Sequence, residues 1–175
     1  MASNENPQPQ RPGFPLIWID GDACPRVVKE IVYRAAERLS VRVKVVANKP
    51  MWVPQSELIE LVLVPHGFDV ADAHIASLVT ATDLVITADV PFAQLVVQRQ
   101  AVAISPKGEI YDAASIGERL AVRNLMTELR SSGEIQGGGR PYSDQDKKAF
   151  AAAFDRILTR LIKQATPRPV RAEQS

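Results

Sequence analysis

The sequence contains a single cysteine, Cys24, among its 175 residues. One thiol can form neither an internal disulfide nor a cysteine-based zinc cage, so disulfide scaffolds and zinc fingers are excluded. No apolar run approaches the roughly 20 residues that a membrane-spanning helix needs, so we expect no membrane crossing. Residues 1–15 also lack an apolar stretch, which predicts no secretory signal and a cytoplasmic location.

A large excess of one charge is also missing, since the formal net charge is only +1. The two signs are nevertheless unevenly placed. Residues 1–118 carry ten Lys or Arg against fourteen Asp or Glu, whereas residues 119–175 carry eleven against six. An acidic front and a basic back suit a metal-dependent enzyme acting on a polyanion, although ordinary solvated surface gives the same pattern.

What is present is the composition of an ordinary globular domain, with 46% apolar and 23% charged residues. Residues 1–15 are rich in Asn, Gln and Pro, and residues 165–175 carry Pro and Arg. We therefore predict two disordered tails around a single domain at residues 16–164.

Short β-branched runs alternate with segments of helical periodicity. Strands are expected at 16–20, 41–46, 61–64, 84–88 and 101–104, and helices near 27–39, 70–79, 92–98, 115–130 and 143–163. Residues 51–60 fit either a loop or a short helix, and Ile110-Tyr111 fits a small hairpin. This alternation predicts an α/β fold: a three-layer α/β/α sandwich with a mainly parallel sheet of about five strands, plus two C-terminal helices.

Acidic residues follow two of the predicted strands. Asp20 closes the first strand and Asp89 directly follows the fourth. In parallel sheets, ligands bind outside the carboxyl ends of the strands, where the strand order reverses. If the first and fourth strands are neighbours, these two carboxylates face one crevice. Asp22 lies in the turn after the first strand, and Asp69 and Asp72 flank the start of the helix that leads into the fourth strand, so these three acids could join the same crevice.

Several carboxylates in one crevice would repel one another unless a hard cation lay between them, and Mg²⁺ and Mn²⁺ prefer such oxygen ligands. Each acid also has a purely structural interpretation. Asp22, Asp69 or Asp72 could cap the helix that follows it. Asp83, which precedes a strand, is interpreted as a turn or capping residue and excluded from the metal set.

Three separated motifs carry a resemblance to a known family: Ile19-Asp20-Gly21-Asp22-Ala23-Cys24-Pro25, Gly67-Phe68-Asp69-Val70-Ala71-Asp72 and Asp83-Leu84-Val85-Ile86-Thr87-Ala88-Asp89-Val90-Pro91. From about Leu16 to Lys163 the chain resembles the bacterial YaiI/YqxD family of uncharacterised proteins. That family has no established activity to transfer. Gly21 is one departure from it, because the family usually has alanine there.

The family is similar in turn to PIN-like nuclease domains, in which acids at the ends of the first and fourth strands bind divalent metal. This likeness implies that Asp20, Asp72 and Asp89 are catalytic. It implies a divalent cation, Mg²⁺ or Mn²⁺, as the cofactor, held by the matching acids Asp20, Asp72 and Asp89. The crevice of carboxylates inferred above adds Asp22 and Asp69 as further candidate ligands. The implied activity is hydrolysis of a phosphodiester in RNA or DNA. From their charge, Lys49, Arg119, Arg123 and Arg140 are candidates for positioning the nucleic-acid backbone.

Two rival functions remain open. The Asp20-Gly21-Asp22 motif after a strand also resembles haloacid-dehalogenase-type phosphatases, in which the first Asp is the nucleophile. Lys107 could supply the lysine of that mechanism, but no later acidic pair completes it. Alternatively, the chain is a non-catalytic binder of nucleic acid or protein that uses the basic residues of its final helices, Lys147, Lys148, Arg156, Arg160 and Lys163.

Four further residues attract attention. Cys24 could act as a nucleophile, but a buried structural thiol is favoured because the neighbouring acids oppose a thiolate. His66 and His74 flank the acidic segment, and we interpret both as surface histidines. Trp52 could stack on a base, although pinning its loop to the core is the favoured interpretation. Whether the protein forms a homo-oligomer is left open.

Overall fold

The structure is a computed structural model that describes residues 14–136 and 140–165. Most of both predicted tails lies outside these residues. The described residues form six strands and five helices, in this order: β1 (Leu16–Asp20), α1 (Arg26–Leu39), β2 (Arg42–Ala47), β3 (Ile59–Leu63), α2 (Val70–Leu78), β4 (Leu84–Ile86), α3 (Val90–Gln98), β5 (Val102–Ile104), β6 (Ile110–Tyr111), α4 (Ile116–Ser131) and α5 (Asp144–Ala165). In the described part of the chain, no helix is both long enough and apolar enough to cross a bilayer.

The six strands form one sheet in the order β3-β2-β1-β4-β5-β6. All pairings are parallel except that of β5 with β6, which is the predicted small hairpin. The mainly parallel sheet is confirmed, with one strand more than the five expected. The strand order reverses direction between β1 and β4, so the switch point lies between these two strands.

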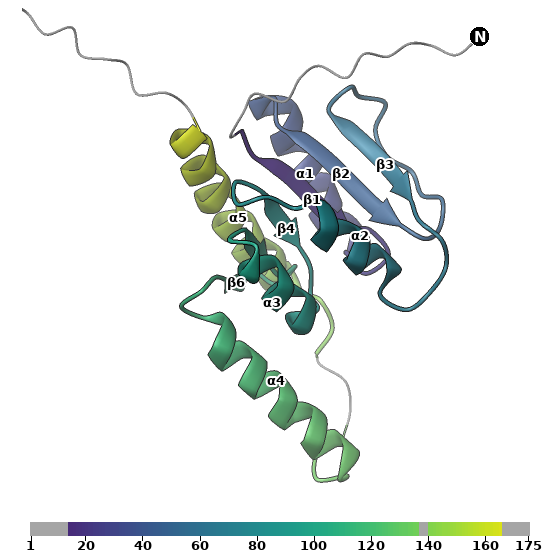
Figure 1. The fold of residues 1–175 in the computed structure, drawn as a ribbon, viewed down its shortest axis with the longest axis vertical. Helices are drawn as coiled ribbons and strands as arrows, with labels where there is room; N and C mark the ends of the chain where they lie inside the picture. Colours follow the sequence, from purple (N-terminus) through teal and green to yellow (C-terminus); the bar gives the residue numbers. More distant parts are fainter. Residues whose placement is uncertain (1–13, 137–139, 166–175) are drawn as a thin grey trace, which may run out of the picture.

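Helices cover both faces of the sheet (Figure 1). On one face, α1 and α5 pack over a core that includes Val28, Val32, Phe150 and Phe154. On the other face, α2 and α3 enclose a second core that includes Trp18, Ile75 and Phe92. The near-continuous burial of β1 and β4 explains why their runs Leu16–Ile19 and Leu84–Ile86 are apolar instead of alternating. In β2, Arg42 and Lys44 are only half-buried, and the strand is fully buried from Val45 onward. The three-layer α/β/α prediction is thereby confirmed.

Two strand boundaries differ from the prediction by two residues, and the other strand boundaries differ by one residue at most. β3 begins at Ile59 instead of residue 61, because Val43 N–H already bonds the Leu58 carbonyl at 2.8 Å and pairing with β2 starts there. β4 ends at Ile86, before the expected end at residue 88. The chain beyond it is held differently, since the amide of Asp89 donates to Thr87 Oγ1 at 3.1 Å.

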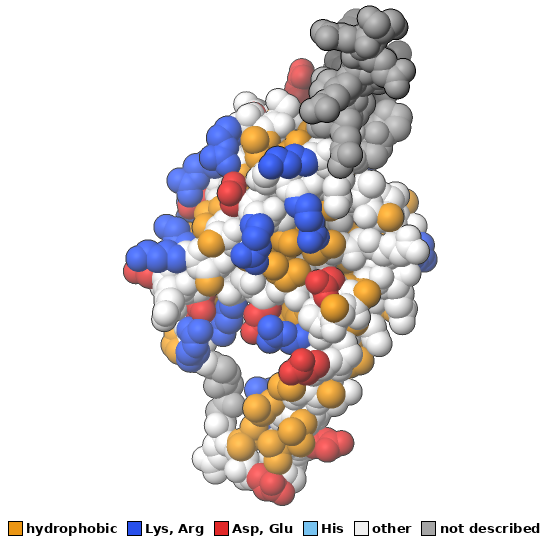
Figure 2. Space-filling view, turned by 90° about the vertical axis from the view of Figure 1, so that its left-hand side faces the viewer, with side chains coloured by type: hydrophobic (Ala, Val, Ile, Leu, Met, Phe, Trp, Pro, Cys, Tyr) orange, Lys and Arg blue, Asp and Glu red, His pale blue; other side chains and the backbone are white. Residues whose placement is uncertain are grey.

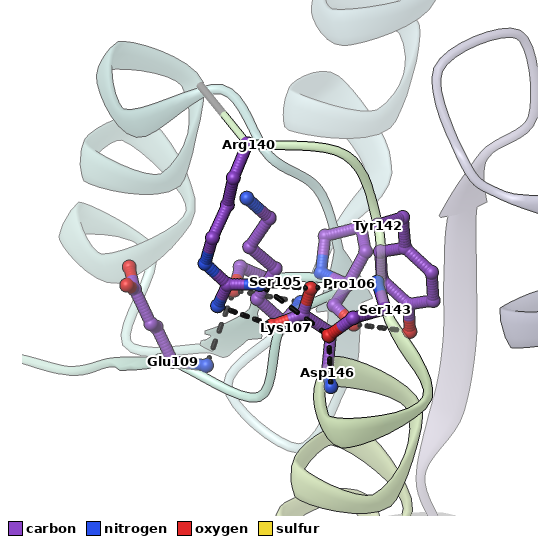
Figure 3. Close-up of polar contacts among 8 residues, drawn as sticks. All are labelled: Ser105, Pro106, Lys107, Glu109, Arg140, Tyr142, Ser143 and Asp146. Carbon is purple, nitrogen blue, oxygen red and sulfur yellow. Dashed lines mark hydrogen bonds and ion pairs between the residues drawn. The ribbon is translucent and has the colours of Figure 1, made fainter.

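The two C-terminal helices differ in how they join the body. At the start of α5 there is a capping box: Ser143 N–H donates to Asp146 and Asp146 N–H donates to Ser143 Oγ. Arg140 adds two hydrogen bonds of 2.7 and 2.8 Å to the same carboxylate, and Tyr142 donates to the Pro106 carbonyl (Figure 3). The entry to α5 is therefore fastened to the turn after β5.

By contrast, α4 extends away from the body beyond α3 and contains no buried residue (Figure 1). It ends at Ser131, one residue beyond the predicted end, and Gly133, with a φ of +77°, suits the termination of a helix. Figure 2 shows hydrophobic side chains on the exposed surface of this helix, which include Val122, Leu125 and Met126.

Candidate metal centre

The carboxyl ends of β1 and β4 carry Asp20 and Asp89. These strands are parallel neighbours, with Ile19 beside Ile86 in the register, so their ends lie at one point of the sheet edge. The condition that the first and fourth strands are neighbours is therefore met. Neighbouring strands are about 4.8 Å apart, which brings side chains that follow them within reach of a single ion.

Three further aspartates reach the same edge from other segments. Asp69 precedes α2, Asp72 lies in its first turn, and the carboxylate oxygens of Asp69, Asp72 and Asp89 lie within 4.8 Å of one another. Asp22 follows Asp20 in the turn after β1. We call Asp20, Asp22, Asp69, Asp72 and Asp89 the acidic edge.

The electrostatics show that these carboxylates sense one another. Burial raises the pKa of Asp20 to about 6, with smaller contributions from the charges of Asp22 and Asp89. Burial also raises the pKa of Asp72 to about 7, assisted by Asp20, Asp89 and Asp69. In the metal-free protein, both groups therefore hold protons at a pH where an ordinary aspartate is ionised.

Some members of the acidic edge also have local structural roles. Asp89 accepts the amide of Phe92 at 3.0 Å and so caps α3. Asp22 accepts the amide of Asn48 at 2.8 Å, which ties the turn after β1 to the end of β2. It does not cap α1: the N-cap position there is Pro25, and the capping interpretation of Asp22 is wrong.

Asp69 occupies the N-cap position of α2 without capping it. Its backbone is left-handed, with a φ of 56°, and its side chain makes no capping hydrogen bond. Capping residues ordinarily have β-region dihedrals, which orient the side chain toward the free amides of the first turn. The left-handed backbone directs the carboxylate instead to Asp72 and Asp89.

The donor set fits a hard divalent cation. The ion pairs identified among the described residues all involve other acids, so no lysine or arginine in that part of the chain forms an ion pair with the acidic edge. Asn48, which bonds Asp22, also has a buried side-chain oxygen without any hydrogen-bond partner. Carboxylate and amide oxygens are the ligands that Mg²⁺ and Mn²⁺ prefer.

The cations expected to contact nucleic acid are distributed over several elements. Lys49 is exposed and follows Asn48 at the carboxyl end of β2, on the same edge as the acids. Arg119 and Arg123 lie on α4, where Arg119 is 3.5 Å from Glu109 and Arg123 donates to Asn124. Arg140 is engaged by Asp146. Only Lys49 is placed by its element at the acidic edge.

The remaining candidates have structural surroundings. Cys24 is buried, and burial raises the pKa of its thiol to about 12, which leaves it protonated and unreactive. His74 lies on α2 with its ring edge-on to Trp18, at a centroid distance of 6.5 Å. His66 is exposed. The group of metal-ligand atoms found among the described residues contains aspartates only.

Sequence reasoning missed Asn48. Its position directly after a strand of the same sheet was the available signal, because Asp20 and Asp89 were recognised by that criterion. An asparagine carries no charge, however, and it was not counted among the carboxylates.

The chain has close relatives in several bacteria. A family model described as "Uncharacterized BCR, YaiI/YqxD family" matches residues 18–160. A UPF0178 protein of Trichlorobacter lovleyi is 52% identical over 149 residues, covering 85% of this chain and 97% of the relative. A UPF0178 protein of Dechloromonas aromatica is 52% identical over 145 residues, covering 83% and 97% respectively. No solved structure matches.

Proposed function

The chain belongs to the YaiI/YqxD family of uncharacterised bacterial proteins, and we propose that it is a divalent-metal-dependent nuclease that hydrolyses phosphodiester bonds of RNA or DNA. One observation carries the proposal. Carboxylates from three separate segments meet at the strand-order switch, within 4.8 Å of one another for Asp69, Asp72 and Asp89, and none of them forms an ion pair with a lysine or arginine of the described residues. Such an arrangement costs folding free energy unless a cation binds there.

The acidic edge would hold Mg²⁺ or Mn²⁺, with Asp20, Asp72 and Asp89 as the catalytic set and Asp22 and Asp69 completing the ligand sphere. A bound ion of this kind activates water and neutralises charge on a phosphate. The chain itself contributes rigid positioning. Asp20 and Asp89 are fixed by adjacent buried strands, and Asp89 is further held by its capping bond to Phe92.

A polyanionic substrate needs cations around the acids. Of the four candidate cations, Lys49 is the one that follows a strand at the same sheet edge as the acids. Its exposed ammonium group would contact a backbone phosphate. Arg119, Arg123 and Arg140 remain candidates for contacts with more distant phosphates. Their present partners are Glu109, Asn124 and Asp146, which a nucleic acid would have to replace or share.

The test is cleavage of labelled RNA and DNA oligonucleotides by the full chain with Mn²⁺, compared with the same reaction in EDTA. The Asp20→Asn/Asp89→Asn variant should lose at least about a thousandfold in rate, because it removes both strand-end ligands. Asp155→Asn is the matched control, since Asp155 lies on α5 in an exposed ion pair with Arg38.

Two outcomes would contradict the proposal. Cleavage that survives in the double variant would come from another site or a contaminant. Absence of cleavage by the wild type, together with salt-sensitive binding of the oligonucleotide, would favour the non-catalytic alternative, a PIN-like domain that binds nucleic acid.

A further inference from the structure

Two aromatic side chains stand out into solvent beside the acidic edge. Trp52 is 73% exposed and Phe68 is 97% exposed. They are the only exposed aromatic residues in the described part of the chain; the other rings are buried or partly buried. The interpretation that Trp52 pins its loop to the core is therefore wrong. Folding favours burial of such large apolar rings, so both exposed rings require an explanation.

The loop of Trp52 is fastened to the acidic turn by its neighbours. Asn48 bonds Asp22, and the sulfur of Met51 lies 3.5 Å from the ammonium group of Lys29, which also donates to the carbonyl of Gly21. Met51 thus faces the turn after β1, and Trp52 follows it with its ring in solvent. The exposure of Trp52 belongs to a loop that is held at two points.

Phe68 is attached to the acidic edge still more directly. It precedes Asp69, the acid whose left-handed backbone turns its carboxylate toward Asp72 and Asp89. The preceding residue, Gly67, has a φ of +157°. The same short loop therefore presents a carboxylate to the metal centre and a phenyl ring to solvent.

We propose that Trp52 and Phe68 are platforms on which unpaired bases of a single-stranded nucleic acid stack while its backbone crosses the acidic edge. This inference rests on the proposed function and specifies the form of the substrate. Every base offers a flat π-face to an aromatic ring, so stacking binds a strand without selecting its sequence. Lys49, three residues before Trp52, supplies the cation for a neighbouring phosphate.

The experiment measures binding of fluorescein-labelled 12-nucleotide single strands by anisotropy. Binding is measured in EDTA and in the cleavage-inactive Asp20→Asn/Asp89→Asn background, so that no turnover occurs. Trp52→Ala and Phe68→Ala should each weaken binding about tenfold, whereas Trp52→Phe should retain most of the affinity. Leu78→Ala is the control, because Leu78 is 49% exposed at the other end of α2.

Salt and abasic strands separate stacking from charge. Lys49→Ala should reduce the slope of log affinity against log salt by about 1, whereas the two aromatic variants should leave the slope unchanged. An abasic strand of equal length should bind about as weakly as the aromatic variants bind the normal strand. Intrinsic fluorescence gives a second readout, because Trp52 is exposed and the other tryptophan, Trp18, is buried.

Three results would overturn the inference: unchanged affinity in both aromatic variants, equal binding of the abasic strand, or a dimer in sedimentation that Trp52→Ala or Phe68→Ala dissociates. Failure of the nuclease proposal is distinguishable from these. Base-dependent binding without Mn²⁺-dependent cleavage would leave the stacking surface standing and remove the activity. Mn²⁺-dependent cleavage with the same KM in the wild type, Trp52→Ala and Phe68→Ala would support the nuclease activity and remove the stacking surface.

Discussion

An aspartate lies near each end of strand β4, and the two carboxylates differ in burial and in hydrogen bonding. Asp83, before the strand, is 4% exposed and accepts three hydrogen bonds of 3.0 to 3.2 Å, from Leu16 N–H, Thr80 N–H and the indole of Trp18. Asp89, after the strand, is exposed, accepts one amide from α3 and faces other carboxylates. Asp83 links β1 and the turn before β4 through hydrogen bonds, whereas Asp89 lies among other carboxylates, where a bound cation would offset its charge.

The difference follows from where each residue lies on a parallel sheet. At the amino edge, free amides of the starting strand and of the preceding turn point toward Asp83 and satisfy it. At the carboxyl edge, the strands present carbonyl groups, and the free amides come from helix N-termini and from loops, as that of Asn48 does. Acids at the carboxyl edge therefore find few hydrogen-bond donors within the protein. A ligand can supply what is missing, and ligand sites in parallel sheets lie at this edge.

Removal of the satisfied carboxylate should have the largest effect. Asp83→Ala leaves three donors without a partner, and at about 1 kcal/mol each the loss is about 3 kcal/mol of unfolding free energy. Asp89→Ala loses one capping bond, worth about 1 kcal/mol, and gains from the reduced repulsion. Urea denaturation in EDTA measures both. Equal losses would show that the two ends of β4 do not differ.

Cation binding should stabilise the folded protein, and this gain should depend on the aspartates at the carboxyl edge. Mn²⁺ at about one hundred times its Kd should add about 2.7 kcal/mol, which raises Tm by about 5–10 °C for a domain of this size. The gain should vanish in Asp20→Asn/Asp89→Asn and persist in Asp155→Asn, measured by thermal unfolding with and without EDTA. A similar gain in the double variant would locate the ion elsewhere.

The pH dependence of stability should expose the strained edge without any metal. The folded pKa values of Asp20 and Asp72, about 6 and about 7, lie above the ordinary value of 3.8. The stability that their protons provide is fully present below about pH 4 and is lost as the pH rises through 6 to 7.

Asp72→Asn cannot lose that proton, so its unfolding free energy in EDTA should fall less between pH 4 and pH 8 than that of the wild type. Asp112→Asn, in the turn before α4, controls for general charge effects. Parallel pH profiles of wild type and Asp72→Asn would contradict the assignment of a raised pKa to this carboxylate.

Most of the fold was predictable because it depends on local rules. Apolar strands bounded by turns identified the sheet, and the structural interpretation of Asp83, which precedes its strand, agrees with its three hydrogen bonds. The Ser143–Asp146 capping box could also be predicted from spacing. The clasp that Arg140 adds to Asp146 could not, because a bidentate pair depends on how the chain enters α5.

The site was predictable only as far as strand order allowed. Asp20 and Asp89 met because β1 and β4 pair, which was the stated condition. The bond from Asn48 to Asp22 depends on how the loop after β2 turns, and the exposure of Phe68 depends on the backbone around Asp69. Such loop geometry arises from tertiary contacts and leaves no periodic signal in the sequence.

Substitution of Asp69 should have the smallest effect on the unfolding free energy, and it separates backbone strain from charge repulsion. A non-glycine residue at a φ of 56° is strained, and Asp69 gains no capping bond in return. Asp69→Gly should therefore stabilise the metal-free protein by about 0.5–1 kcal/mol through relief of the backbone alone, with relief of repulsion added to it. Asp69→Asn removes the charge and keeps a side chain that tolerates the left-handed region.

The difference between Asp69→Gly and Asp69→Asn in urea denaturation measures the strain, and the difference between Asp69→Asn and wild type measures the repulsion. Both variants should also weaken the stabilisation by Mn²⁺. If Asp69→Gly were less stable than wild type in EDTA, its carboxylate would have a structural bond like those of Asp83. The contrast between the two edges of the sheet would then fail at this residue, because a strained acid is retained at the carboxyl edge only where its charge has a use.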